Sequence, residues 1–195
     1  NSYSDLQSTT DPNYSDTSLT NYQFTPRINH LTDLFGKILN LTYGLDLQYA
    51  DYKSYRKKNE SAIPLHVYDA WQTTQSLYSQ QSIYLTNDTT LGTGLRLQRN
   101  RIAIGDHVDT KAPNYSRDTE HVTLSDQETN YAVNIGLDHT LNENTIIYGR
   151  LGNGFRYPNI DDRIGGSGAT SLELNTQTTK DFEIGSKFSS DNFSS

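Results

Sequence analysis

The sequence predicts an all-β fold, an antiparallel up-and-down meander of about seven strands that forms part of a transmembrane β-barrel. Three observations lead to this fold class. Apolar and polar residues alternate with a period of two, short and long connections alternate along the chain, and each long connection carries a proline. We expect short turns on the periplasmic side and long loops on the extracellular side.

The clearest alternation runs from Leu39 to Tyr49. Leucine and tyrosine occupy the odd positions, and asparagine, threonine, glycine, aspartate and glutamine occupy the even positions. Because successive side chains of a strand point to opposite faces, this segment is predicted to be a strand with one apolar face. The same pattern returns in residues 91–98, 131–141 and 181–188. The sequence shows no convincing amphipathic helix.

The order of strands and connections follows from this pattern. We expect strands near residues 21–30, 37–50, 73–86, 90–104, 129–141, 144–156 and 178–189. Short connections are predicted at 31–36, 87–89, 142–144 and 189–192, and long ones at 51–72, 105–128 and 157–177. The long loops contain Pro64, Pro113 and Pro158, whereas Pro26 falls inside the first predicted strand and weakens it. This sorting favours a membrane barrel, because loops longer than about a dozen residues are uncommon in soluble sandwiches.

The composition is compatible with a membrane barrel. Of the 195 residues only 33% are hydrophobic, and the mean hydropathy is -0.75. No apolar run reaches the roughly eighteen residues of a spanning helix, but a spanning strand needs only about ten residues with one apolar face. The 14 tyrosines suit both strands and membrane-interface belts.

The composition also excludes several classes of function. The chain has no cysteine, which excludes a disulfide scaffold, a zinc cage and a thiol nucleophile. The net charge is -7, and no basic run extends beyond residues 55–59, so we expect no nucleic-acid partner. The histidines are scattered and no nucleophile elbow is present, so we expect no enzyme, no cofactor and no metal site.

The chain contains no methionine, even at position 1, and no signal peptide. We therefore interpret residues 1–195 as one partial barrel segment, either processed or cut from a longer protein.

The alternation assigns side chains to two faces of the predicted barrel. The residues expected to face lipid are Leu41, Leu45, Leu47, Leu95, Leu97, Ile135 and Leu137, and those expected to face the lumen are Asp46, Arg96, Asp138 and Glu183. Glycines share the lumen face, at positions 44, 92, 94, 136 and 185. These glycines indicate either a lumen that holds water or a plug, or relief of strand curvature.

Three stretches resemble TonB-dependent outer-membrane receptors. Within residues 144–163 the matching positions are Gly154, Phe155, Arg156, Pro158 and Asn159. The following strand of the family is matched by Thr178, Phe182, Glu183, Ile184, Gly185 and Lys187, and residues 76–98 are similar to one of its hairpins. The matches occur in the family's order and together cover about Ser76 to Phe188.

The resemblance implies a receptor of about 22 strands with an N-terminal plug domain. Such receptors import scarce nutrients, typically ferric siderophores, haem or cobalamin, with energy from the inner-membrane TonB complex. This sequence contains neither a plug nor a TonB box. Haem receptors of the family usually carry a histidine between the Phe-Arg-x-Pro corner and the next strand, and residues 158–178 contain none. We therefore expect an iron chelate as ligand and outer-membrane lipid as surroundings.

Arg156 and Tyr157 are the candidate ligand-binding residues. They lie where a strand enters a long loop, and an arginine beside an aromatic ring suits an anionic chelate. Alternatively, Arg156 anchors the strand at the outer headgroup level. Asp161–Arg163, with the glycines that follow, are interpreted as a flexible solvated loop, although acidic pairs can also bind Ca²⁺.

Two other functions stay open. One is a soluble β-sandwich for adhesion or carbohydrate binding, which would need no detergent. The other is a porin without a plug.

Overall fold

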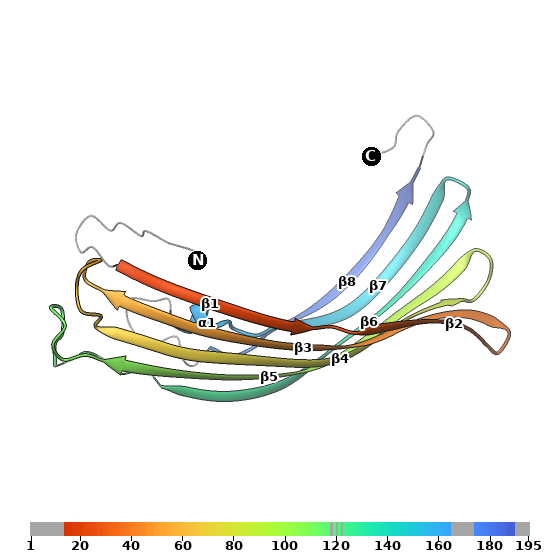
Figure 1. Ribbon diagram of the computed structural model, residues 1–195. Helices are drawn as coiled ribbons and strands as arrows, with labels where there is room; N and C mark the ends of the chain where they lie inside the picture. Colours follow the sequence, from red (N-terminus) through yellow and green to blue (C-terminus); the bar gives the residue numbers. More distant parts are fainter. Residues whose placement is uncertain (1–13, 118, 120, 122, 165–173, 190–195) are drawn as a thin grey trace.

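The computed structural model describes residues 14–117, 119, 121, 123–164 and 174–189, and these form one curved sheet (Figure 1). The strand order is β1-β3-β4-β5-β6-β7-β8, with β2 also paired to β3, and every pairing is antiparallel. The predicted all-β meander is therefore confirmed. No helix in the described part of the chain is long and apolar enough to cross a membrane.

The elements have the following bounds: β1 Tyr14–Phe24, β2 Arg27–Leu34, β3 Lys37–Lys57, β4 His66–Tyr84, β5 Thr89–Val108, β6 Leu124–Asn142, β7 Thr145–Arg156, α1 Ile160–Ile164 and β8 Gln177–Phe188. Strands β3 and β5 have 21 and 20 residues. A bilayer needs only about ten residues per strand, so these strands extend well beyond it.

The prediction of one strand at 21–30 is wrong, because the chain divides there into β1 and β2. Both pair with β3, with Phe24 opposite Leu47 and Arg27 opposite Gly44. Pro26 lies between them and has no N–H to donate. Its carbonyl oxygen accepts a hydrogen bond of 3.1 Å from the Leu45 amide. The proline interrupts the strand, and the sheet continues on both sides of it.

The long strands β3 to β6 run further toward the long loops than the sequence predicted. The connections are correspondingly shorter, at 58–65 and 109–123, and Pro64 and Pro113 lie within them as expected. The reason is a change of phase. In β3, whose end was predicted at residue 50, the large apolar residues are odd-numbered from Leu39 to Tyr49, but the buried Tyr52 is even-numbered. In β5 the same change falls inside the predicted strand, between Leu97 and Ile102. The period of two continues although the apolar face changes sides.

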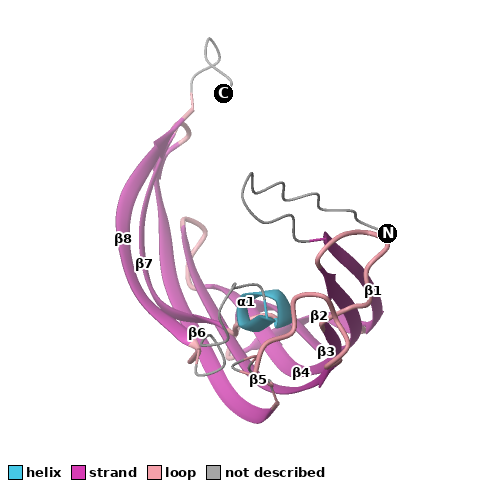
Figure 2. Ribbon diagram, turned by 90° about the vertical axis from the view of Figure 1, so that its left-hand side faces the viewer, coloured by secondary structure: helices cyan, strands magenta, loops and turns pink. Residues whose placement is uncertain are grey.

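The two faces of the sheet are identified by α1, which lies on the concave side (Figure 2). Tyr52, Ile102 and Ile104 pack in one cluster with Ile160 and Ile164 of α1, so even-numbered residues of β3 and β5 face the concave side. The rest of that cluster is Tyr68 and Ala70, with Leu124 against it. The core thus lies at the end of the sheet that carries the long connections.

The opposite, convex face carries the predicted lipid-facing residues. Exposed members are Leu47, Leu95, Leu97, Ile135 and Leu137, whereas Leu41 and Leu45 are half-buried. On the concave face Asp46 accepts a hydrogen bond of 2.9 Å from Arg96. Asp138 pairs with Tyr148 in the ladder, and the Tyr148 hydroxyl donates to Glu183. The predicted division into two faces is confirmed.

The concave-face glycines have a role that the sequence did not indicate. Gly44 is directly opposite Tyr78, and Gly185 is opposite Tyr148. A Cβ atom at either glycine would lie 2.6 Å from the tyrosine hydroxyl. The glycines therefore make room for a tyrosine ring from the neighbouring strand.

Short turns occur at three of the predicted places, but the first is shorter than predicted, because residues 31–34 belong to β2. Phe35 and Gly36 join β2 to β3 with φ angles of 53° and 74°, residues 85–88 join β4 to β5, and residues 143–144 join β6 to β7. The turn predicted at 189–192 lies outside the described residues after Ser189.

Candidate ligand-binding site

Near its C-terminal end, β7 stops pairing with β6 several residues before it stops pairing with β8. Pairing between β6 and β7 stops at Asn134 and Gly152, whereas β7 stays paired with β8 as far as Arg156 and Gln177. The chain is therefore free to turn from this corner over the concave face.

The side chain of Asn153 closes the gap between the separating strands. Its Oδ1 accepts a hydrogen bond of 2.8 Å from the Val133 amide, and its Nδ2 donates at 2.9 Å to the carbonyl oxygen of Tyr131. One carboxamide thus replaces a pair of backbone ladder bonds. The backbone N–H and C=O groups at this edge of β6 therefore keep hydrogen-bond partners where β7 turns inward.

Tyr157 attaches the corner to β5. Its hydroxyl donates a hydrogen bond of 2.9 Å to the backbone carbonyl of Gln98. Its ring meets the ring of Phe155 edge-on, with 5.3 Å between the centroids. Burial is the largest cause that raises the pKa of this phenol above its usual value. The hydroxyl of one of the two predicted site residues therefore has a protein partner.

Arg156, the other predicted site residue, is exposed. Its side chain is 64% exposed, and Nη2 lies 3.2 Å from Oδ2 of Asp162. The same oxygen accepts a bond from the Asn159 amide, and the Asn159 side chain accepts one from the Asp162 amide. This reciprocal pair caps the N-terminus of α1, which begins one residue after Asn159.

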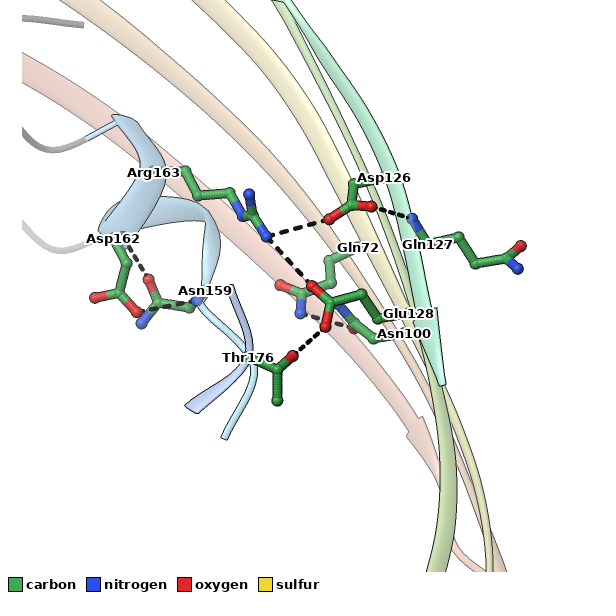
Figure 3. Close-up of polar contacts among 9 residues, drawn as sticks. All are labelled: Gln72, Asn100, Asp126, Gln127, Glu128, Asn159, Asp162, Arg163 and Thr176. Atoms are coloured by element: carbon green, nitrogen blue, oxygen red, sulfur yellow. Dashed lines mark hydrogen bonds and ion pairs between the residues drawn. The ribbon is translucent and has the colours of Figure 1, made fainter. Parts of the chain in front are cut away.

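The remaining residues of α1 are fixed to the sheet, so the prediction of a flexible solvated loop at Asp161–Arg163 is wrong. The Arg163 side chain is only 2% exposed and lies between Asp126 at 3.4 Å and Glu128 at 4.0 Å (Figure 3). The Tyr52 hydroxyl donates to Asp161 at 2.8 Å. Carboxylates on β6 and the tyrosine on β3 thus hold the helix. The glycines after Arg163 lie outside the described residues.

A cavity of about 420 Å³ lies between this segment and the concave face. Its lining residues are Gln48, Gln72, Thr74, Arg96, Gln98, Ala132, Gly154, Phe155, Arg156 and Tyr157. A second cavity of about 300 Å³ lies beside it and is lined by residues of β1, β3, β4 and 159–161. The predicted pair Arg156 and Tyr157 therefore shares one cavity wall.

Arg96 is the residue of this cavity that sequence reasoning placed in the lumen but not in the site. Its guanidinium group donates to Asp46 at 2.9 Å, to Ser76 at 2.8 Å and to Gln98 at 3.0 Å. It also lies 5.8 Å from the ring centroid of Tyr78. These partners hold the cation in one orientation. The sequence signal that could have found it is a lone arginine on the polar face of a strand.

A second polar group lies above the core at the same end of the sheet. His66 Nδ1 is 2.9 Å from Asp106 Oδ2, and the His66 ring stacks on Tyr68. Burial, followed by the charge of Asp106, raises the pKa of Tyr68 to about 12. At neutral pH this phenol is a neutral member of the core.

Among solved structures the chain is similar to large transport receptors. It matches the copper transporter OprC with a TM-score of 0.74 and 13% identity, over 97% of this chain and 31% of that one. It matches the closed form of the ferric-catecholate import receptor Fiu from E. coli K12 with a TM-score of 0.64 and 14% identity, over 89% and 29% of the two chains. It matches the unliganded form of the ferric citrate transporter FecA with a TM-score of 0.65 and 12% identity, over 94% of this chain and 27% of that one.

These likenesses show the fold, and the chain spans less than a third of each of those three structures. No curated protein matches the sequence significantly. The family model for the TonB dependent receptor-like β-barrel matches residues 1–195, the whole length of the chain. That family consists of receptors and not of enzymes. The chain therefore belongs to the TonB-dependent receptor family and forms part of its outer-membrane β-barrel.

Proposed function

We propose that this chain forms part of the barrel wall of a nutrient transporter that takes up an iron chelate, most specifically a ferric siderophore. The observation that carries the proposal is the cavity between Arg96 and Arg156 on the concave face. A barrel wall needs neither an exposed arginine above its lumen nor a strand end folded over it. Both are expected where a receptor holds a ligand.

The two arginines give the cavity its chemistry. Guanidinium groups bind carboxylate and other oxygen anions with paired hydrogen bonds, and catecholate or carboxylate iron chelates present such oxygens. Arg96 has protein partners on several donors, whereas Arg156 has one exposed carboxylate partner. We therefore assign ligand contact first to Arg156.

Tyr157 has a different role in this proposal. Its hydroxyl bonds to β5, so it positions the corner, and its ring lines the cavity beside Phe155. An aromatic surface next to a cation suits a flat aromatic chelating group. The amide side chains of Gln48 and Gln72 add donors across the cavity.

The proposal includes a plug domain and the TonB complex as partners outside this chain. The family model supports this reading over the soluble sandwich and over a porin without a plug. The concave face is polar, which suits a wall that surrounds either water or a plug.

The test uses the complete protein that carries this chain, expressed in iron-limited cells. We expect Arg156→Ala to weaken binding of a ferric siderophore by about tenfold, because a charged hydrogen bond contributes about 1.5–3 kcal/mol. Lys53→Ala is the matched control, since it removes a cation from the convex face that pairs with Asp69. Tyr157→Phe retains the ring and should have a smaller effect than Tyr157→Ala.

Barrel assembly is measured in parallel by resistance of the folded band to detergent at room temperature. Lost binding with normal assembly supports a ligand contact at Arg156. Unchanged binding, or joint loss of binding and assembly, leaves Arg156 as a strand anchor and contradicts the assignment.

A further inference from the structure

The convex face shows where the outer surface of the membrane lies on this chain. Along β5 the outward residues Leu91, Leu95 and Leu97 are apolar, and Leu97 is opposite Tyr131 of β6. Further along, Ala103 is opposite Trp71 of β4. Tyr131 and Trp71 are 63% and 39% exposed. Aromatic residues of this kind collect at the level of lipid headgroups.

This level belongs to the extracellular leaflet. The long connections 58–65 and 109–123 lie at this end of the strands, and the short turns lie at the other. Outer-membrane barrels place long loops outside and short turns in the periplasm.

Two arginines lie on the convex face within this aromatic level. Arg99 and Arg101 follow Leu97 at alternate positions of β5, so all three point to the same side. Both guanidinium groups bond to one atom, Oε1 of Gln127, at 2.6 Å from Nη2 of Arg99 and 2.8 Å from Nε of Arg101. Gln127 is thus a shared hydrogen-bond acceptor that holds the two positively charged side chains next to each other.

The two charges have no protein counter-ion among the described residues. No carboxylate in that part of the chain lies within ion-pair distance of Arg99 or Arg101. The nearby convex-face cation Lys53, by contrast, pairs with Asp69 at 3.3 Å. The whole chain has a net charge of -7, so an unpaired cationic pair is a local exception. An anion from outside the chain would complete it.

We propose that Arg99 and Arg101 form a binding site for the phosphorylated headgroup of an outer-leaflet lipid. Phosphate oxygens match the paired donors of guanidinium groups, and the lipid's acyl chains would lie over Leu95 and Leu97 below. A free phosphate ion would gain only the charged contact. A lipid would gain both the charged contact with the arginines and the apolar contact with the leucines. We therefore assign the site to a lipid and not to a free phosphate ion. This site is independent of the cavity on the concave face.

The test is native mass spectrometry of the complete protein in detergent with diphosphorylated lipid A, its dephosphorylated form, or inorganic phosphate. We expect the diphosphorylated lipid to bind at least about tenfold more tightly than the dephosphorylated one, since each cation near an anionic lipid adds to binding. The variant with Arg99→Gln and Arg101→Gln should lose this difference. Inorganic phosphate should bind weakly to both proteins.

The matched control is Arg150→Gln, which removes one cation from the concave face near Asp138. It should retain the preference for the phosphorylated lipid. Should the double variant fail to assemble, Arg99→Lys with Arg101→Lys tests the same point, because lysine retains the charge without the paired donors and should give intermediate binding. Equal binding of both lipids by the original protein would overturn the proposal, and so would a preference for the phosphorylated lipid that the Arg99→Gln and Arg101→Gln variant retains.

Discussion

Tyr157 bonds to a strand that is not its neighbour: its hydroxyl lies 2.9 Å from the carbonyl oxygen of Gln98, 59 residues earlier in the chain. β6 lies between β7 and β5 in the sheet. The contact is possible only because the chain crosses over the concave face of β6 at this point. Residues 157–164 are thereby folded over the concave face, and Tyr157 becomes part of one wall of the cavity.

Removal of the buried arginine should release α1. Arg163→Met takes the cation away from Asp126 and Glu128 and leaves the two carboxylates facing each other. Loss of one partner of a buried pair is strongly destabilising, but these carboxylates are partly exposed, so we expect on the order of 2 kcal/mol. Hydrogen exchange of residues 160–164 should accelerate while exchange in β3 and β5 stays slow. The surface variant Arg156→Met should change exchange in the helix much less.

The change of phase explains why the end of β3 was predicted too early, at residue 50 instead of Lys57. From Leu39 to Tyr49 the large apolar side chains of β3 lie on the convex face, and beyond it Tyr52 faces the core under α1. In β5 the corresponding change lies between Leu97 and Ile102. A single rule of alternation fits each half but fails at the junction. What the sequence could not supply was the presence of α1, because its apolar residues Ile160 and Ile164 gain a partner only when the connection folds back.

A charge on the lipid face should damage folding much more than a lost charge on the lumen face. Leu45→Arg places a cation on the convex side, at an expected cost of about 2–4 kcal/mol near mid-bilayer. Asp46→Asn leaves Arg96 with Ser76 and Gln98 as partners and should cost less than about 1 kcal/mol. Folding yield into lipid vesicles distinguishes the two. Equal yields would contradict the assignment of the two faces.

Asn153 should be required for the separation of β6 and β7. Asn153→Ala leaves the Val133 amide and the Tyr131 carbonyl without their partners, which we expect to cost about 1–3 kcal/mol. Asn153→Asp retains the acceptor and loses the donor, so its loss should be smaller. Denaturant unfolding of the complete barrel measures both. A stability of Asn153→Ala equal to the original would show that water replaces the side chain without loss.

The candidate site was only partly accessible from the sequence. Arg156 and Tyr157 are predicted from their position at a strand end before a long loop, and both line the cavity, while their ligand role stays a prediction. The bond from Tyr157 to Gln98 and the role of Arg96 could not be found, because they depend on which strands the corner crosses. The helix α1, Ile160–Ile164, was missed because five residues are too short for a periodic signal.

Alkaline pH should weaken the core under α1. The pKa of Tyr68 is raised to about 12, so in the unfolded chain this phenol ionises first, at its usual value of 10.0. Its contribution to stability is therefore complete below pH 10 and is lost as the pH rises toward 12. Ultraviolet difference titration of the original protein against Tyr68→Phe should show one phenol ionising near pH 12. Ionisation near pH 10 would mean that the phenol is open to water.

Accessibility of Ile164 to a thiol reagent tests most directly whether residues 157–164 are docked on the concave face. The chain has no cysteine, so Ile164→Cys in a cysteine-free version of the complete protein provides a single label site. Ile164 is 7% exposed, whereas Lys58 is exposed in the connection 58–65. On intact cells a membrane-impermeant maleimide should label Ile164→Cys at least about tenfold more slowly than Lys58→Cys, because the buried site reacts only when α1 opens. Equal labelling rates would contradict the docked connection and the cavity that it forms.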